Sequence, residues 1–145
     1  YLVHLADNTS QFTHIGIIAF ENGNPYVIHA VPHKNKNLKK ESFSDFLNPK
    51  NASSYAIYRS YYNTETLTKV VNEAQNFYLK KYTFDNEYDL KTDTKLYCTE
   101  LILKAFNNAG IYLKLSAKEF DYVIGKRKII FPSEFTKKAE FNRII

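Results

Sequence analysis

Residues 13–31 read THIGIIAFENGNPYVIHAV, and this stretch decides how the rest of the chain is interpreted. Two runs rich in β-branched and aromatic residues lie on either side of ENGNP at residues 21–25. Gly, Asn and Pro clustered in this way are a strong turn signal, and apolar runs around such a turn are typical of paired strands. The stretch therefore predicts a β-hairpin.

The hairpin carries two of the four histidines, and its register decides whether they meet. If the loop has four residues, so that Phe20 faces Pro25, then His29 lies opposite Gly16. His14 is then a diagonal neighbour of His29 on the same face, within reach of a long side chain. Gly16 has no side chain that could fill the space between them. A five-residue loop would instead place the two histidines on opposite faces.

Two later segments have the three- and four-residue spacing of amphipathic helices. One covers residues 64–80, where Asn63 or Thr64 can cap the N-terminus. The other runs from Cys98 to Asn108, and Gly110 suits its C-terminal cap. The apolar positions are Leu67, Val70, Val71, Ala74 and Phe77 in the first helix and Leu101, Ile102, Ala105, Phe106 and Ala109 in the second.

The other segments are shorter or have no period. They are expected to form a long loop with one helical turn (32–53), a strand (54–61), a loop (82–96) and two strands that end at Pro132 (122–124 and 128–131). With 145 residues and 44% hydrophobic residues, the chain can build one core. The order of elements predicts a single α+β domain over residues 1–145, with a mostly antiparallel sheet packed against helices.

The net charge of +5 invites comparison with nucleic-acid-binding proteins. The basic residues are spread along the chain, however, and the one local cluster, Lys34, Lys36, Lys39 and Lys40, is explained by a solvated loop. We therefore expect no nucleic-acid partner, while attraction to an anionic surface, wall polymer or lipid headgroup stays open. No apolar run approaches the roughly 18 residues of a membrane-spanning helix, so no transmembrane segment is expected.

The single cysteine, Cys98, excludes an internal disulfide and stands at the predicted start of a helix. Helix N-termini stabilise anions, so a thiol at this position is expected to have a lowered pKa. The backbone N–H groups of Cys98 and Thr99 would be free to donate to a developing oxyanion. The alternative is a buried structural thiol, which is common for unpaired cysteines.

A thiol, a histidine and a polar orienting group form a general nucleophile–base set. In this set His14 takes the proton of Cys98, and His29 holds the ring of His14; a half-exposed strand residue is the alternative for His29. No close-spaced Cys or His pair indicates a metal site, and there is no glycine-rich phosphate loop, so neither a metal nor a cofactor is expected.

Two blocks of the sequence resemble the YiiX-like, circularly permuted papain-fold proteins of the NlpC-type superfamily. THIGII resembles their Ser-His-Val-Gly-Ile motif, and YVIHAV resembles the strand that carries their third polar residue. YTFDNEYDLKTDTKLYCTELILKAF resembles their second block, which contains an Asp and then Tyr-Cys-Ser-Glu-Leu. The resemblance covers roughly residues 8–135, and FPS at 131–133 resembles a late strand that ends in Pro.

The resemblance implies a papain-like α+β fold in permuted order and hydrolysis of an amide or ester through a thioacyl-enzyme. It matches Cys98 to the nucleophile and His14 to the base. His29 stands where many YiiX-like sequences have Glu, and it is similar to the third position of NlpC peptidases and lecithin retinol acyltransferase relatives. Thr99 replaces the usual Ser, and Tyr97, Thr99 and Glu100 are expected to support the Cys turn or the oxyanion.

Three functions fit these residues: an amidase or peptidase for small peptide or N-acyl amide bonds such as those of cell-wall peptides, a lipid acyl hydrolase or acyltransferase, and a non-catalytic binding module. The aromatic-rich loop 82–97 and the Lys-rich loop 34–40 are compatible with a lipid. The chain starts at Tyr1 and contains no methionine, so it is expected to be a processed product. An extracytoplasmic protein (secreted, periplasmic or a lipoprotein) is expected, with a cytoplasmic one as the alternative.

Overall fold

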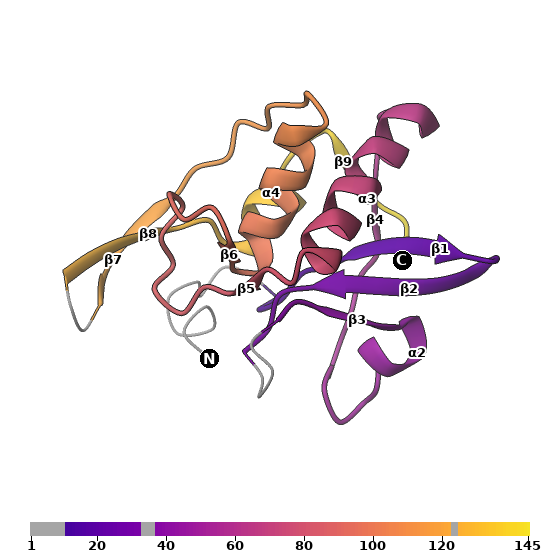
Figure 1. The fold of residues 1–145 in the computed structure, drawn as a ribbon, viewed down its shortest axis with the longest axis horizontal. Helices are drawn as coiled ribbons and strands as arrows, with labels where there is room; N and C mark the ends of the chain where they lie inside the picture. Colours follow the sequence, from indigo (N-terminus) through magenta and orange to yellow (C-terminus); the bar gives the residue numbers. More distant parts are fainter. Residues whose placement is uncertain (1–10, 33–36, 123–124) are drawn as a thin grey trace.

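The computed structural model describes residues 11–32, 37–122 and 125–145, and its first element is the predicted hairpin (Figure 1). Strand β1 (Ile17–Glu21) pairs antiparallel with β2 (Asn24–His29), and Phe20 faces Pro25. Asn22 and Gly23 form the turn between them with φ values of 52° and 79°. Positive φ at both central residues is what a tight hairpin turn requires, and Asn-Gly supplies it at low cost. The predicted pairing of Phe20 with Pro25, on which the contact between the two histidines depends, is therefore confirmed.

A third strand, β3 (Lys39–Ser42), pairs antiparallel with the other side of β2. It completes a three-stranded sheet in the order β1-β2-β3, which is the main sheet of the fold. This segment was expected to be a loop, which is wrong. Its sequence, KKES, has no apolar alternation, and charged residues are common on sheet edges because they discourage further pairing. The one helical turn expected in this region is confirmed as α2 (Phe43–Phe46).

Both predicted helices are present, as α3 (Thr64–Leu79) and α4 (Cys98–Asn108). The side chain of Asn63 caps α3 by accepting a hydrogen bond from the N–H of Thr66. The helices pack against each other, and α3 also packs against β1 and β2 (Figure 1). Among the apolar positions predicted for them, the buried ones are Val70, Ala74 and Phe77 in α3 and Leu101, Ile102, Ala105 and Phe106 in α4. The apolar faces predicted from periodicity thus form the centre of the core.

Three two-stranded sheets complete the fold of the described residues. Strand β4 (Tyr58–Ser60), shorter than expected, pairs antiparallel with β9 (Phe141–Arg143). The segment expected to be a loop at 82–96 contains the short parallel pair β5 (Thr83–Phe84) and β6 (Lys95–Leu96). The sheets are thus mostly antiparallel, as predicted, and β5 and β6 place the residues that lead into Cys98.

The C-terminal hairpin consists of β7 (Lys118–Tyr122) and β8 (Gly125–Ile129). The first strand was expected at 122–124, of which 123–124 lie outside the described residues. Pro132 does not simply end a strand, because it is the first residue of helix α5 (Pro132–Thr136). A proline fits there since the first N–H of a helix has no intrahelical acceptor.

His4, His33, Lys34 and Lys36 also lie outside the described residues. Among the helices that the structure describes, none combines the length and apolar character needed to cross a membrane.

Candidate active site

Cys98 is the first residue of α4, as predicted, and only 6% of its surface is exposed. Burial raises the pKa of the Cys98 thiol to about 11, although the backbone N–H groups of Thr99, Ile15 and Cys98 itself act in the opposite direction. The expectation of a lowered thiol pKa is therefore wrong. A helix N-terminus stabilises an anion by about 0.3–1 kcal/mol, which is less than removing a thiolate from water costs.

Ile15 ties together the two parts of the candidate site. Residues 14–16 immediately precede β1, and the backbone N–H of Ile15 is placed so that it favours the thiolate of Cys98 at the start of α4. The residue next to His14 thus acts electrostatically on the thiol. Segments more than 80 positions apart in the sequence therefore lie near each other around Cys98.

His14 and His29 are hydrogen-bonded, with 2.9 Å between Nε2 of His14 and Nδ1 of His29. The register explains this contact, because a Cβ placed on Gly16 would lie only 3.1 Å from Cβ of His29 and 2.6 Å from Cγ1 of Val27. Glycine therefore lets the segment before β1 approach β2 closely. The predicted contact between the two histidines is confirmed.

Burial and, to a smaller extent, the neighbouring His29 lower the pKa of His14 to about 4, although the charge of Glu41 acts in the opposite direction. Near pH 7 the ring of His14 is therefore neutral, with a lone pair on one nitrogen. A neutral imidazole is the form that can accept a proton from a thiol. The resting site thus holds a protonated thiol and a neutral histidine, and not an ion pair.

Two residues of this cluster were not predicted. Glu41 of β3 accepts a hydrogen bond from His29, with 2.7 Å between Oε1 and Nε2. The ring of Phe46 of α2 lies 5.0 Å from that of His29 and 5.9 Å from that of His14, measured between centroids. No sequence signal indicated either residue, because both contacts depend on β3, whose pairing has no apolar pattern.

The side chains of Tyr97 and Thr99 fix the start of α4 by holding one residue of the C-terminal segment. The N–H of Ile130 donates to the Tyr97 hydroxyl at 3.2 Å, and the Thr99 hydroxyl donates to the Ile130 carbonyl at 2.6 Å. Tyr97 and Thr99 are fully buried. Their side chains thus clamp the backbone on both sides of Cys98.

Glu100 supports the same turn from within the helix. One of its oxygens accepts the N–H of Tyr97 at 3.3 Å, and the other lies 3.0 Å from Nζ of Lys104. Burial and, to a smaller extent, the charge of Asp85 raise the pKa of Glu100 to about 7, against the effect of Lys104. Lys104 also donates to the carbonyl of Thr92, so it connects α4 to the loop before Cys98.

That loop is organised by the buried carboxylate of Asp85, which accepts the N–H groups of Glu87 at 2.9 Å and Asp89 at 2.6 Å. Its aromatic side chains turn inward. Tyr88 contacts the rings of Phe84 and Tyr97, with centroids 6.1 and 5.3 Å apart. These rings pack on the core and do not form an exposed apolar surface.

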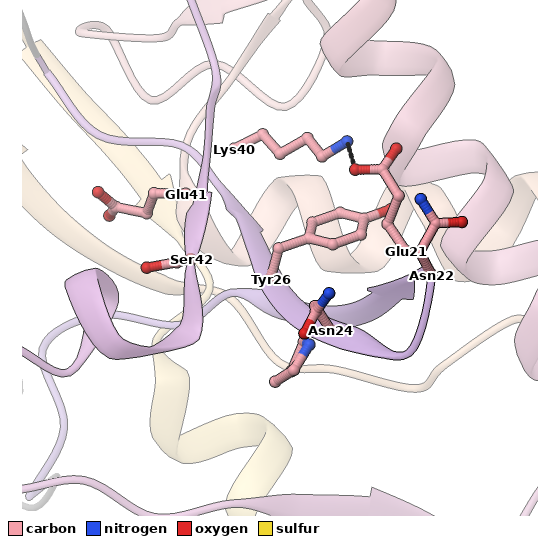
Figure 2. A pocket seen from close by; sticks show the side chains of 8 residues that line it. Glu21, Asn22, Asn24, Tyr26, Lys40, Glu41 and Ser42 are labelled. Carbon is pink, nitrogen blue, oxygen red and sulfur yellow. Dashed lines mark hydrogen bonds and ion pairs between the residues drawn. The ribbon is translucent and has the colours of Figure 1, made fainter.

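A hollow of about 400 Å³ lies at the hairpin end of the main sheet (Figure 2). In it, Nζ of Lys40 lies 3.0 Å from the carboxylate of Glu21 and 4.2 Å from the ring centre of Tyr26. Neither Cys98 nor His14 lines this hollow. Among the residues that the structure describes, no three His, Cys, Asp or Glu side chains are placed to hold a metal ion.

The fold is similar to that of the metalloprotein YiiX from Escherichia coli O157:H7, a crystal structure with a TM-score of 0.80. The match covers 99% of this chain and 87% of that chain, at 16% sequence identity. At this identity the likeness concerns the fold alone. No curated protein sequence matches the chain.

The sequence family described as permuted papain-like amidase enzymes, YaeF/YiiX, matches residues 3–144. This match covers nearly the whole chain and agrees with the order of the site residues, with His14 before Cys98. The protein is therefore a member of the C92 family of permuted papain-like cysteine amidases.

Proposed function

We propose that this protein cleaves a peptide or N-acyl amide bond through a thioacyl-enzyme on Cys98, with His14 as base and His29 as its orienting residue. The observation that carries the proposal is the placement of the Ile15 backbone N–H near the Cys98 sulfur, where it favours the thiolate. It brings the segment of the paired histidines to the thiol. The His at position 29 is also similar to the third position of NlpC-type peptidases, which favours the same reaction class.

In the first step, the sulfur of Cys98 attacks the carbonyl carbon of the substrate, and the thiol proton moves to Nδ1 of His14. Nδ1 is the nitrogen of His14 that can accept this proton, because Nε2 is hydrogen-bonded to His29. The carbonyl π electrons move to oxygen and form an oxyanion. With a thiol pKa of about 11, proton transfer accompanies attack and does not precede it.

The oxyanion needs donors that are in place before the reaction. The backbone N–H groups of Cys98, Thr99 and Ile15 all favour a negative charge on the sulfur. Donors around a nucleophile are suited to a charge that develops on the carbonyl oxygen beside it. The clamp on Ile130 and the bond from Tyr97 to Glu100 hold these N–H groups in position.

The oxyanion then collapses, the C–N bond breaks, and the amine leaves with the proton from His14. Water attacks the thioester while His14 removes one of its protons. The C–S bond breaks, the carboxylic acid leaves, and the proton on His14 returns to the sulfur. The net reaction consumes one water and one amide, and it leaves Cys98 as a thiol.

For the substrate we propose a peptide or N-acyl amide of the kind found in cell-wall peptides, acted on outside the cytoplasm. The net charge of +5 supports this choice, because it attracts an anionic wall polymer. The lipid alternative lacks comparable support, since the rings of residues 82–97 that suggested it pack against the core. A lipid ester is therefore included in the test as a competing substrate.

The test is a panel of peptide amides, N-acyl amides and lipid esters, assayed with the wild type, Cys98→Ala, His14→Gln and Glu21→Gln. Glu21 is a matched control because it is an exposed carboxylate of the same sheet, paired with Lys40. We expect at least one amide to be cleaved, a loss of roughly 100-fold or more in the first two variants, and no change in the third. Cleavage of lipid esters alone would support the acyl hydrolase, and no cleavage at all would contradict the proposal.

A further inference from the structure

We infer that Glu41 is a positioning residue of this site. Through His29, it determines which of the two ring nitrogens of His14 carries the proton. The inference rests on the proposed function for its catalytic meaning. Its structural basis is a continuous chain of hydrogen bonds from Glu41 through His29 to His14. Neither the sequence nor the family resemblance assigns a role to Glu41.

The three side chains lie on one face of the main sheet. Glu41 is directly opposite Val27, and His29 is opposite Lys39, so Glu41 and His29 are diagonal neighbours on adjacent strands. His14 stands in the same relation to His29 on the other side. Figure 2 shows Lys40 and Glu41 leaving β3 on opposite sides, which separates Glu41 from the ion pair of Lys40 and Glu21.

The direction of each hydrogen bond follows from the carboxylate. An ionised carboxylate can only accept, so Nε2 of His29 must carry a proton. In neutral His29, Nδ1 then has a lone pair and accepts from Nε2–H of His14. Neutral His14 consequently has its lone pair on Nδ1, which is the tautomer that can accept the proton of Cys98. Glu41 thus selects the active tautomer of a residue that it does not touch.

A doubly protonated His29 would reverse the second bond. Its Nδ1–H would donate to Nε2 of His14 and so move the proton of neutral His14 to Nδ1, leaving no lone pair for the thiol. Among the described residues, the charged or titratable groups that face His29 include His14 from the segment before β1 and Glu41 from β3, with Lys39 3.9 Å from Glu41. Phe46, which packs on it from α2, is uncharged.

Burial and aromatic packing around His29 and Glu41 leave little room for water to replace their hydrogen bond. The side chain of His29 is 5% exposed and that of Glu41 is 24% exposed, and the ring of Phe46 packs on both histidines. Water is a poor substitute for a buried partner when an aromatic ring occupies the adjacent space. Removal of the carboxylate therefore leaves the Nε2–H of His29 without this acceptor and frees both rings to exchange tautomers.

The test measures the tautomers directly by imidazole ¹⁵N NMR near pH 7.5, in the wild type, Glu41→Ala, Glu41→Gln and the control Glu21→Gln. Histidine signals are assigned with His14→Gln and His29→Gln. We expect Nε2–H at His14 in the wild type and the control, a mixture in Glu41→Ala, and an intermediate result in Glu41→Gln, whose amide can either accept or donate. A wild-type His14 protonated on Nδ1 would overturn the inference, whether or not the protein hydrolyses any substrate.

Kinetics on a cleaved amide supply the catalytic part of the test. Glu41→Ala should lower kcat roughly 10-fold to 100-fold with little change in KM, and Glu41→Gln should recover part of the loss. In Glu41→Gln the acid limb of the pH–rate profile should move to lower pH, because the carboxylate no longer favours protonated His29. If Glu41→Ala and Glu41→Gln lost equal fractions of kcat and the pH–rate profile did not move, Glu41 would have a merely structural role. A tautomer that depends on Glu41 in a protein without amidase activity would refute the proposed function and leave the inference intact.

Discussion

Cys98 experiences two opposing effects at the scale of a single residue. The start of α4 and three backbone N–H groups favour its thiolate, and burial disfavours it. The first effect could be predicted from the sequence, because the sequence shows that Cys98 stands at the start of a helical pattern. The second effect depends on what covers the helix terminus, and only the tertiary structure contains that information.

Alkylation of the only cysteine measures the outcome of this competition. We expect iodoacetamide to label native Cys98 slowly near pH 6 and faster as the pH rises toward 11, because burial raises the thiol pKa. In the urea-denatured protein, the labelling rate should follow the titration curve of an ordinary thiol, with its midpoint at about pH 8.5. Fast labelling of the native protein at pH 6 would show that the thiolate is already present at rest.

His14 gives a dependence of stability on pH with a definite sign. Its pKa is lowered from 6.5 to about 4 on folding, so the unfolded chain binds the proton more tightly between these values. The free energy of unfolding should therefore fall as the pH drops from 6.5 toward 4, by at most about 1.4 kcal/mol per pH unit. Urea unfolding of the wild type and His14→Gln checks this.

Glu100 must be considered in the same experiment because its effect has the opposite sign. Its pKa is raised from 4.5 to about 7, so its contribution to stability is lost as the pH rises through that window. The quantity to compare is therefore the difference between wild type and His14→Gln at each pH. A difference that does not vary between pH 4 and 6.5 would contradict the lowered pKa of His14.

Gly16 tests whether the close approach of two segments positions the histidines. In Gly16→Ala the new methyl group would lie 2.6 Å from Cγ1 of Val27 and 3.1 Å from Cβ of His29. We expect a loss of about 1–3 kcal/mol in stability and a lower amidase rate, because His29 must shift. The substitution should cost less in a Val27→Ala background, where the closest contact is absent. Equal costs in both backgrounds would show that the clash is not the cause.

At the scale of elements, prediction succeeded where the sequence has a period or a turn signal. The hairpin followed from Asn22-Gly23, and α3 and α4 followed from apolar residues at helical spacing. Strand β3 was missed because Lys39–Ser42 is polar and its pairing depends on β2. Glu41 was missed for the same reason, whereas His14 and His29 were identified because one hairpin contains both.

The clamp between α4 and Ile130 can be tested by removing one hydroxyl. Thr99→Val keeps the shape of the side chain but leaves the buried Ile130 carbonyl without its donor at 2.6 Å. We expect a loss of about 1–3 kcal/mol in the free energy of unfolding. Thr68→Val is the matched control, since the Thr68 hydroxyl bonds to the Thr64 carbonyl on the exposed side of α3. A similar loss in both variants would argue against a specific clamp.

At the scale of the whole molecule, the chain order places His14, the proposed base, before Cys98, the proposed nucleophile. The hairpin with His14 and His29 is separated in the sequence by α3 from the helix that begins at Cys98, yet the backbone of Ile15 lies near enough to favour the Cys98 thiolate. The α+β class and the mostly antiparallel pairing were predicted from the order of elements. That residues 1–145 unfold as one domain stays a prediction.

The central claim is that Cys98 forms a thioacyl intermediate, and the intact mass of the protein during turnover measures it most directly. The wild type is mixed with an activated N-acyl substrate, quenched in acid within the first turnovers and weighed. We predict an increase equal to the acyl group, located on Cys98, which disappears on longer incubation and is absent in Cys98→Ala. Turnover of an amide substrate by Cys98→Ala, or an acyl group on another residue of an active wild type, would contradict the account.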